Sequence, residues 1–253
     1  MTTHPYLAPG FTALAHRGFS LDGLENSMRA FEDAVALGYR YVETDAHGTR
    51  DGVAVALHDA SLERTTDARG DVADLPWSEV RTARIGGIEP VPLLEDLLGT
   101  WPDLRVNIDV KAVSGIVPIA DAIERTASHD RVCIASFSTR RREATVRRLS
   151  RAVATSAGTS EAVAYFSQGA VGLPVRRALR RVDALQVPRR AGRATVLTAR
   201  HVRAAHAADT LVHVWTINDP AEMSELIDMG VDGLVSDRAD LLKELLVSRG
   251  LWE

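Results

Sequence analysis

The stretch ENSMRAFEDAVALGYRYVETD, residues 25–45, predicts a helix followed directly by a strand. Apolar side chains at Met28, Phe31 and Val35 recur at helical spacing, and Gly38 stands where the C-terminal cap of a helix belongs. The closing seven residues begin in aromatic side chains and end in two acids, which favours a strand that leads into a polar site. The stretch therefore predicts one unit of an alternating α/β fold.

The same alternation continues along the chain. Apolar runs predict eight strands, at residues 11–15, 39–45, 104–110, 132–136, 152–156, 183–187, 211–217 and 231–235. Helical periodicity occupies residues 25–37, 116–128, 139–150, 159–181 with a break at Pro174, 199–208, 220–229 and 238–248. Eight such units in 253 residues predict a single (β/α)₈ TIM barrel. An open doubly wound sheet is the competing fold, but no Gly-x-Gly-x-x-Gly motif follows the first strand.

One segment interrupts the alternation after the second strand. Asp51-Gly52 is a hairpin signal, and the alternating run 53–57 that follows it ends at His58. We expect one domain over residues 1–253, with an insertion at 46–92 between the second strand and its helix. Loops at the carboxyl ends of barrel strands hold the active sites of this fold, so the insertion is expected beside the site.

Composition excludes several classes of function. Lys and Arg number 30 against 34 Asp and Glu, so there is no basic surplus for a nucleic-acid partner. No secretion signal and no apolar run of roughly 18 residues are present, so we expect a cytoplasmic protein without stable membrane insertion. Cys133 is the only cysteine, which excludes an intramolecular disulfide and a thiolate metal cluster. Any metal must be held by oxygen or imidazole.

Acidic side chains end two neighbouring strands. Glu43 and Asp45 are two apart and share a face of the second strand, and Asp109 and Lys111 repeat the pattern in NIDVK. Three carboxylates in a partly desolvated pocket repel one another, so they are neutralised or titrate abnormally. A hard divalent cation with oxygen ligands resolves the conflict, which predicts Mg²⁺ or Ca²⁺, with Mn²⁺ as a further candidate.

Two histidines are expected at the same mouth of the barrel. His16 ends the first strand and His58 ends the inserted strand, and imidazoles carry protons near neutral pH. Arg17 and Lys111 add two fixed cations. Such a set suits a small-molecule phosphodiester, because one histidine can take a proton from the nucleophile while the other gives one to the leaving oxygen.

Seven motifs resemble, in order and spacing, those of the glycerophosphodiester phosphodiesterase family, and together they cover nearly the whole chain. They are AHRGF, LEN, YVETD, LHDASLERTT, NIDVK, VWTIN and GVDGLVSDRAD. The resemblance implies a (β/α)₈ barrel, a divalent metal, and hydrolysis of glycerophosphodiesters to glycerol 3-phosphate and an alcohol. It also implies roles for seven residues: His16 and His58 as the catalytic pair, Arg17 and Lys111 as phosphate contacts, and Glu43, Asp45 and Asp109 as metal ligands.

The chain departs from the family pattern at two places. Asp109 stands where the family more often has Glu, and the missing methylene withdraws the carboxylate by roughly 1.5 Å. The ion must then shift, or a water must bridge. His47 matches no ligand of the family, and it is either a further metal or substrate contact or a surface residue of the hairpin. Trp215, at the end of the seventh strand, is predicted to bind substrate as an apolar wall for the glycerol carbons.

Three further residues have a structural interpretation beside the functional one. Asn26 is a natural N-cap for the first helix, and Glu25 suits the positive end of a helix. The resemblance implies that both also brace the site. Arg64, in the insertion, is expected to hold its own loop in place.

Other functions remain open from the sequence. A phospholipase D-like enzyme on lysophospholipids or sphingolipids would need an apolar groove, and the insertion offers only Leu75, Trp77 and scattered aliphatic residues. A barrel that stabilises an enolate would use Lys111 as its base. A binding protein without turnover would not need two histidines. For the hydrolase, attack by a neighbouring hydroxyl of the substrate to form a cyclic phosphate competes with attack by water.

Overall fold

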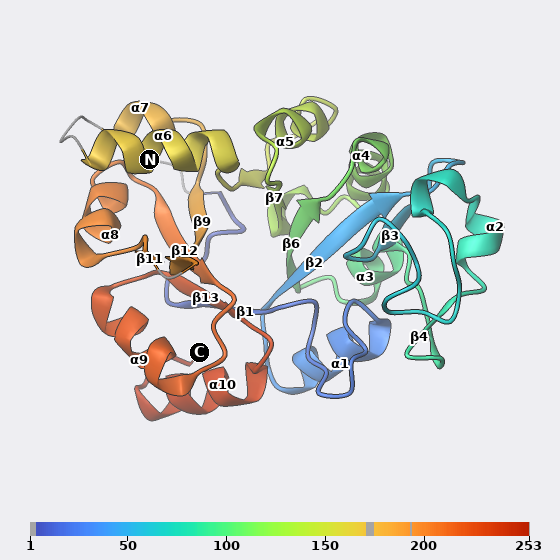
Figure 1. Ribbon diagram of the computed structural model, residues 1–253, viewed down its shortest axis with the longest axis horizontal. Helices are drawn as coiled ribbons and strands as arrows, with labels where there is room; N and C mark the ends of the chain where they lie inside the picture. The colour runs from blue at the N-terminus through green and yellow to red at the C-terminus, as the bar shows by residue number, and fades with distance from the viewer. Residues whose placement is uncertain (1–3, 171–174, 193, 253) are drawn as a thin grey trace.

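Parallel strands form a nearly closed barrel at the centre of the molecule (Figure 1). The computed structural model describes residues 4–170, 175–192 and 194–252. Within these residues the barrel has eight parallel strands: β1 (Thr12–Ala15), β2 (Tyr41–Gly48), β6 (Arg105–Val110), β7 (Val132–Ala135), β8 (Ala154–Thr155), β9 (Ala184–Pro188), β12 (Leu211–Trp215) and β13 (Gly233–Ser236). Each pairs with the next, β13 returns to β1, and a single bridge between Ser156 and Ala184 joins β8 to β9. The predicted TIM barrel is confirmed.

Helices surround the barrel and follow its strands (Figure 1). They are α1 (Met28–Ala36), α3 (Leu94–Thr100), α4 (Ile116–Arg125), α5 (Thr139–Val146), α6 (Thr159–Ala170), α7 (Arg176–Leu179), α8 (Ala199–His206), α9 (Pro220–Met229) and α10 (Ala239–Ser248). Helical periodicity did not predict α3, because its seven residues make only about two turns. Pro174, the predicted break, lies outside the described residues. Within the part of the chain described, no helix has both the length and the apolar character needed to cross a bilayer.

The N-cap of the first helix lies one residue later than the cap predicted from the sequence. Ser27 is the N-cap of α1, and its hydroxyl oxygen accepts a hydrogen bond from the backbone N–H of Ala30 at 3.1 Å. Phe31 is fully buried against the core, which contributes about 1.5–3 kcal/mol to stability. Gly38 follows the helix with a φ of +91°, the left-handed conformation expected of a glycine that ends a helix. Asn26 is therefore free for another role.

Side chains that point into the barrel change character along its length. One apolar group consists of Tyr6, Leu14, Tyr41, Cys133, Ala154 and Val235. A polar group follows, in which the half-buried Gln186 exchanges hydrogen bonds of 3.3 and 3.4 Å with Asn107 and lies 3.3 Å from Nδ1 of His213. Because Asn107 pairs with Glu43, and Asp109 with Asp45, between β6 and β2, the acids lie toward the carboxyl ends of these strands. The polar end of the interior is the mouth of the barrel.

The segment after β2 forms a small subdomain at the side of the barrel (Figure 1). The end of β2 pairs antiparallel with β3 (Ala54–Ala56), so the predicted hairpin is present, and Gly52 has a φ of +82° in its turn. The remaining elements are η1 (Val72–Asp74), α2 (Trp77–Val80), β4 (Arg84–Ile85) and β5 (Glu89–Pro90). Their apolar core consists of Val55, Leu57, Leu62, Val72, Val80, Ala83, Ile85 and Val91. This packing holds His58 beside the barrel mouth.

Candidate active site

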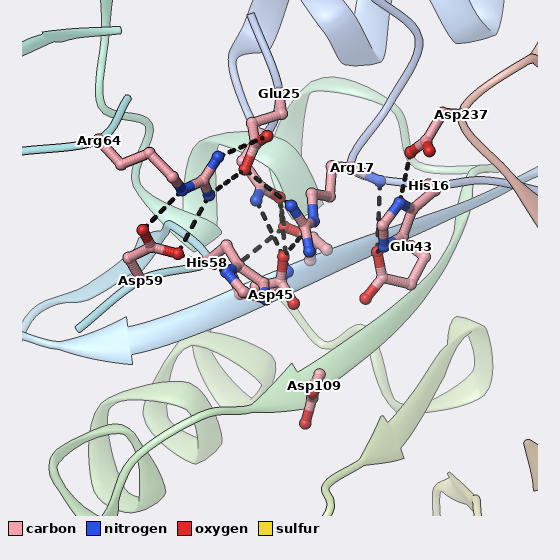
Figure 2. Close-up of polar contacts among 12 residues, drawn as sticks. His16, Arg17, Glu25, Glu43, Asp45, His58, Asp59, Arg64, Asp109 and Asp237 are labelled. Carbon is pink, nitrogen blue, oxygen red and sulfur yellow. Dashed lines mark hydrogen bonds and ion pairs between the residues drawn. The ribbon is translucent and has the colours of Figure 1, made fainter. Parts of the chain in front are cut away.

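The predicted site residues gather at the carboxyl ends of β1, β2 and β6 and beside β3. His16 Nε2 lies 3.8 Å from Glu43, while Arg17 Nε lies 2.9 Å from Asp45. Figure 2 shows His16 on one side of Arg17 and Asp45, and His58 on the other. The stretch that follows the first strand therefore delivers two polar side chains, His16 and Arg17, to the site.

A left-handed turn sets the direction of these side chains. Arg17 has a φ of +55° and Gly18 a φ of +81°. A Cβ at Gly18 would lie 2.6 Å from the backbone carbon of Ala30, so only glycine allows the turn to pack on α1. In this conformation the backbone N–H of Arg17 donates to Oε2 of Glu43 at 3.2 Å, while its guanidinium reaches Asp45. One residue thus contacts two predicted metal ligands.

Glu25 and Asn26 brace the site, as the resemblance implied. Nη1 of Arg17 donates to Oε1 of Glu25 at 2.8 Å. The side-chain amide of Asn26 donates to Oδ2 of Asp45 at 3.1 Å, and its oxygen accepts from the Thr44 hydroxyl at 2.8 Å. The interpretation of Asn26 as a helix cap was wrong, because Ser27 caps the helix and Asn26 turns inward to the acid.

Lys111 lies between two of the predicted ligands. Its ammonium nitrogen is 2.7 Å from Oδ1 of Asp45 and 2.9 Å from Oδ2 of Asp109. Burial opposes the ionisation of Asp45, but the charges of Lys111 and Arg17 outweigh it and lower the pKa of this carboxyl. Burial likewise disfavours the ammonium of Lys111, but Asp45 and Asp109 outweigh it and raise its pKa. These charges remain fixed near neutral pH.

Among the described residues, no Lys or Arg side chain forms an ion pair with Glu43, which instead lies near His16 and accepts from the backbone N–H of Arg17. Burial, followed by repulsion from Asp45, raises the pKa of Glu43 to about 8, with Asp109 adding to the repulsion and His16 opposing it. Oδ1 of Asp109 is buried and has no hydrogen-bond partner among the described residues. An orphaned carboxylate oxygen, and a carboxyl whose pKa is raised by burial and by neighbouring acids, are what a cluster of acids shows when it needs one more cation.

The fit of this cluster to a metal can be judged from its donors. As the side chains lie, the described part of the chain has no group of three His, Cys, Asp or Glu side chains placed to hold an ion, and the Lys111 ammonium stands between two of the acids. The donors themselves, three carboxylates on adjacent strands, have the chemistry that Mg²⁺, Ca²⁺ or Mn²⁺ prefers. The chemistry therefore fits a hard divalent cation.

His16 is oriented by a carboxylate from the other end of the chain. Its Nδ1 lies 2.6 Å from Oδ1 of Asp237, and the side-chain amide of Asn218 donates to the second oxygen of that carboxylate at 2.8 Å. Burial opposes protonation of His16, but the hydrogen bond with Asp237 and the charge of Glu43 raise its pKa. Sequence reasoning missed Asp237 and Asn218, although both lie in motifs that carried the resemblance.

His58 has a similar arrangement within the insertion. Its Nδ1 lies 2.5 Å from Oδ1 of Asp59, the next residue in the chain. Arg64 donates to the other oxygen of Asp59 at 2.6 Å, and this hydrogen bond holds the pKa of the carboxyl well below its usual range. His47 is buried, with Nε2 3.1 Å from the backbone oxygen of His58. The interpretation of His47 as a surface residue was wrong, since it supports the backbone of His58.

Aromatic side chains border the site on the side of β7 and β12. Trp215 packs edge-to-face with Phe137, with ring centroids 5.6 Å apart. Phe137 is 56% exposed, and Nζ of Lys111 lies 5.8 Å from its ring centroid. Trp215 therefore reaches the charged cluster through Phe137, at a position suited to an apolar wall. Its contact with substrate stays a prediction.

Comparison with known proteins finds a matching family and a relative similar over nearly the whole chain. Residues 16–241 match the model of the glycerophosphoryl diester phosphodiesterase family. The chain is 47% identical over 247 residues to a "Probable glycerophosphodiester phosphodiesterase 2" of Mycobacterium tuberculosis, covering 96% of this chain and 94% of that protein.

Solved structures share the fold. A glycerophosphodiester phosphodiesterase from Agrobacterium tumefaciens superimposes with a TM-score of 0.75 at 23% identity, covering 94% of this chain and 99% of the other. An Oleispira antarctica phosphodiesterase in complex with the product sn-glycerol-3-phosphate gives 0.79 at 20% identity, covering 94% and 97%. The barrel, the family match and the close relative all agree with the resemblance seen in the motifs, and the chain belongs to the glycerophosphoryl diester phosphodiesterase family.

Proposed function

We propose that the protein hydrolyses glycerophosphodiesters to glycerol 3-phosphate and an alcohol, by proton transfer through His16 and His58 with a divalent cation bound at the acids. One observation carries the proposal: each of the two imidazoles has its Nδ1 on a carboxylate, Asp237 or Asp59, at the same barrel mouth. This arrangement fixes the tautomer and leaves Nε2 of each ring for proton transfer. The family relationship supports the reaction class.

The cations of the site provide the binding part of the proposal. Arg17 and Lys111 are held by acids rather than left free, so their positions are set before a substrate arrives. Placed beside a phosphodiester, both oppose the negative charge that grows in the transition state. Trp215 and Phe137 then face the glycerol carbons. Preorganised charge of this kind accelerates a reaction more than a flexible surface cation does.

Glu43, Asp45 and Asp109 are the residues that would hold the cation. A divalent ion at this place supplies Lewis acidity toward a phosphoryl oxygen and offsets the charge of the three carboxylates. The orphaned oxygen of Asp109 and the raised pKa of Glu43 support the assignment. Asp45 is shared, because Lys111, Arg17 and Asn26 already contact it.

The two histidines divide the proton transfers. One takes a proton from the attacking hydroxyl, either a neighbouring hydroxyl of the substrate or water, and the other donates a proton to the oxygen of the departing alcohol. Attack by the neighbouring hydroxyl passes through a cyclic phosphate, whereas attack by water does not. Detection of a cyclic glycerophosphate in rapidly quenched reactions distinguishes them.

An assay panel tests the proposal. Purified protein is incubated with glycerophosphocholine, glycerophosphoethanolamine, a lysophospholipid and bis(p-nitrophenyl) phosphate, each with EDTA or with added Mg²⁺, Ca²⁺ or Mn²⁺. We expect release of glycerol phosphate that EDTA abolishes, and roughly 10²–10⁴-fold losses in His16→Ala and His58→Ala. Unchanged rates in both variants contradict the catalytic assignment. Activity confined to the lysophospholipid indicates the phospholipase D-like alternative.

A further inference from the structure

Arg64 contacts two carboxylates that each reach a different part of the site (Figure 2). Its Nε and Nη2 donate to the two oxygens of Asp59 at 2.6 and 3.1 Å. Its Nη2 and Nη1 donate to the two oxygens of Glu25 at 2.7 and 3.1 Å. All three guanidinium nitrogens are used, and both carboxylates are held in a forked geometry.

Beyond these carboxylates lie the groups of the proposed reaction. Asp59 holds Nδ1 of His58 at 2.5 Å, and Glu25 holds Nη1 of Arg17 at 2.8 Å. A continuous path of hydrogen bonds therefore runs from His58 through Asp59, Arg64 and Glu25 to Arg17. It joins the insertion to the turn after β1, two segments whose relative position decides the distance between the imidazole and the phosphate contact.

We propose that Arg64 is a positioning residue for the reaction. Its planar guanidinium holds the carboxylates of Asp59 and Glu25. These carboxylates in turn set the orientation of the His58 imidazole and of the Arg17 guanidinium. This inference rests on the proposed function, since it assumes that His58 transfers a proton. Arg64 itself does not touch the reacting atoms. It acts through the two carboxylates.

The chemistry of the side chain distinguishes this role from loop anchoring. A lysine carries the same charge, but its single nitrogen cannot make two forked contacts at once. Arg64 is partly exposed, its side chain 47% accessible, and exposed ion pairs add little to stability. A small misplacement of a catalytic group, in contrast, can slow a reaction about a hundredfold. Loss of Arg64 should thus affect turnover far more than folding.

The experiment compares Arg64→Ala and Arg64→Lys with Arg50→Ala. Arg50 is a matched control, because it is an exposed arginine of the same insertion that donates to a backbone oxygen, that of Asp74. Thermal unfolding, kcat and KM for glycerophosphocholine are measured for each.

We expect Arg64→Ala to lower kcat about 10- to 100-fold and to raise KM through Arg17, with a melting temperature close to that of the wild type. Arg64→Lys should recover little of the kcat, and Arg50→Ala should match the wild type. Wild-type kcat in Arg64→Ala, or full recovery by Arg64→Lys, overturns the inference. If Arg64→Ala does not fold, the lysine variant decides. Wild-type activity in His58→Ala contradicts the proposed function instead, whatever Arg64 does.

Discussion

Nδ1 of His16 lies 2.6 Å from Oδ1 of Asp237, although the two residues are 221 positions apart in the chain. The contact forms because β1 and β13 are neighbours in the barrel, with Ala15 paired to Ser236. The side-chain amide of Asn218 donates to Oδ2 of Asp237, and its oxygen accepts a hydrogen bond from the backbone N–H of Asp237 at 2.9 Å. Segments near the two ends of the chain thus meet at His16, one of the two proposed proton-transfer residues.

Asp237→Asn should lower kcat roughly 100-fold or more, because an amide no longer selects the tautomer in which Nε2 of His16 is the free nitrogen. Folding should change little, since the amide fits the same space. Steady-state kinetics on glycerophosphocholine with added Mg²⁺ measure the effect. Asp240→Asn is the control, as this half-buried acid at the start of α10 pairs with Arg238. Comparable kcat in the two variants contradicts a role for Asp237 in orienting His16.

Asp109→Asn should weaken the binding of Mg²⁺, Ca²⁺ or Mn²⁺ on the order of tenfold or more, because the site loses one of three ligand charges. Asp109→Glu keeps the charge and should retain binding. Isothermal titration calorimetry measures the affinity directly, independent of turnover. Asp103→Asn, an exposed acid just before β6, serves as the control. Equal affinity in Asp109→Asn and the wild type removes Asp109 from the ligand set.

His213 should make the protein less stable in mild acid. Burial lowers the pKa of this imidazole from 6.5 to about 4, so the folded state keeps it neutral. The contribution of the neutral imidazole to the free energy of unfolding is complete above pH 6.5. It is lost as the pH falls from 6.5 toward 4, because His213 takes up a proton in the unfolded chain before it does so in the folded protein. The loss amounts to about 3 kcal/mol at pH 4 and below.

Urea unfolding between pH 7.5 and 4.5 measures this effect. Other groups also titrate there, so the informative quantity is the difference between the wild type and His213→Gln. The two stabilities should converge as the pH falls, since glutamine carries no titratable proton. Parallel curves over the whole range would show that His213 is not kept neutral by burial.

Gly18→Ala should destabilise the protein more than Gly52→Ala. Both glycines have φ near +80°, which costs an alanine about 1–2 kcal/mol. At Gly52 the new methyl group meets open space, whereas at Gly18 it lies 2.6 Å from the backbone of Ala30. The Gly18 variant therefore adds an overpacking cost of about 1–3 kcal/mol. Equilibrium unfolding compares them, and equal losses would contradict the close packing of the turn on α1.

The sequence by itself determined the barrel, the family and the position of the charged groups along each strand. Helical and strand periodicity are local properties, so a few residues such as Met28, Phe31 and Val35 suffice to recognise them. The alternation of side chains along a strand is local too, so the sequence alone places Glu43 and Asp45 on one face of the strand. The short helix α3 has too few turns for a helical period to be recognised in the sequence.

Only the tertiary structure decided which groups meet. Asp237 could not be assigned to His16, nor Arg64 to Glu25, because these partners come from segments far apart in the sequence and are joined by barrel closure and by the packing of the insertion. Asn26 has the sequence features of a cap, yet it turns to Asp45, since Ser27 already satisfies the helix end. Periodicity records which face a side chain occupies, whereas contact across the barrel depends on how distant strands and loops pack together.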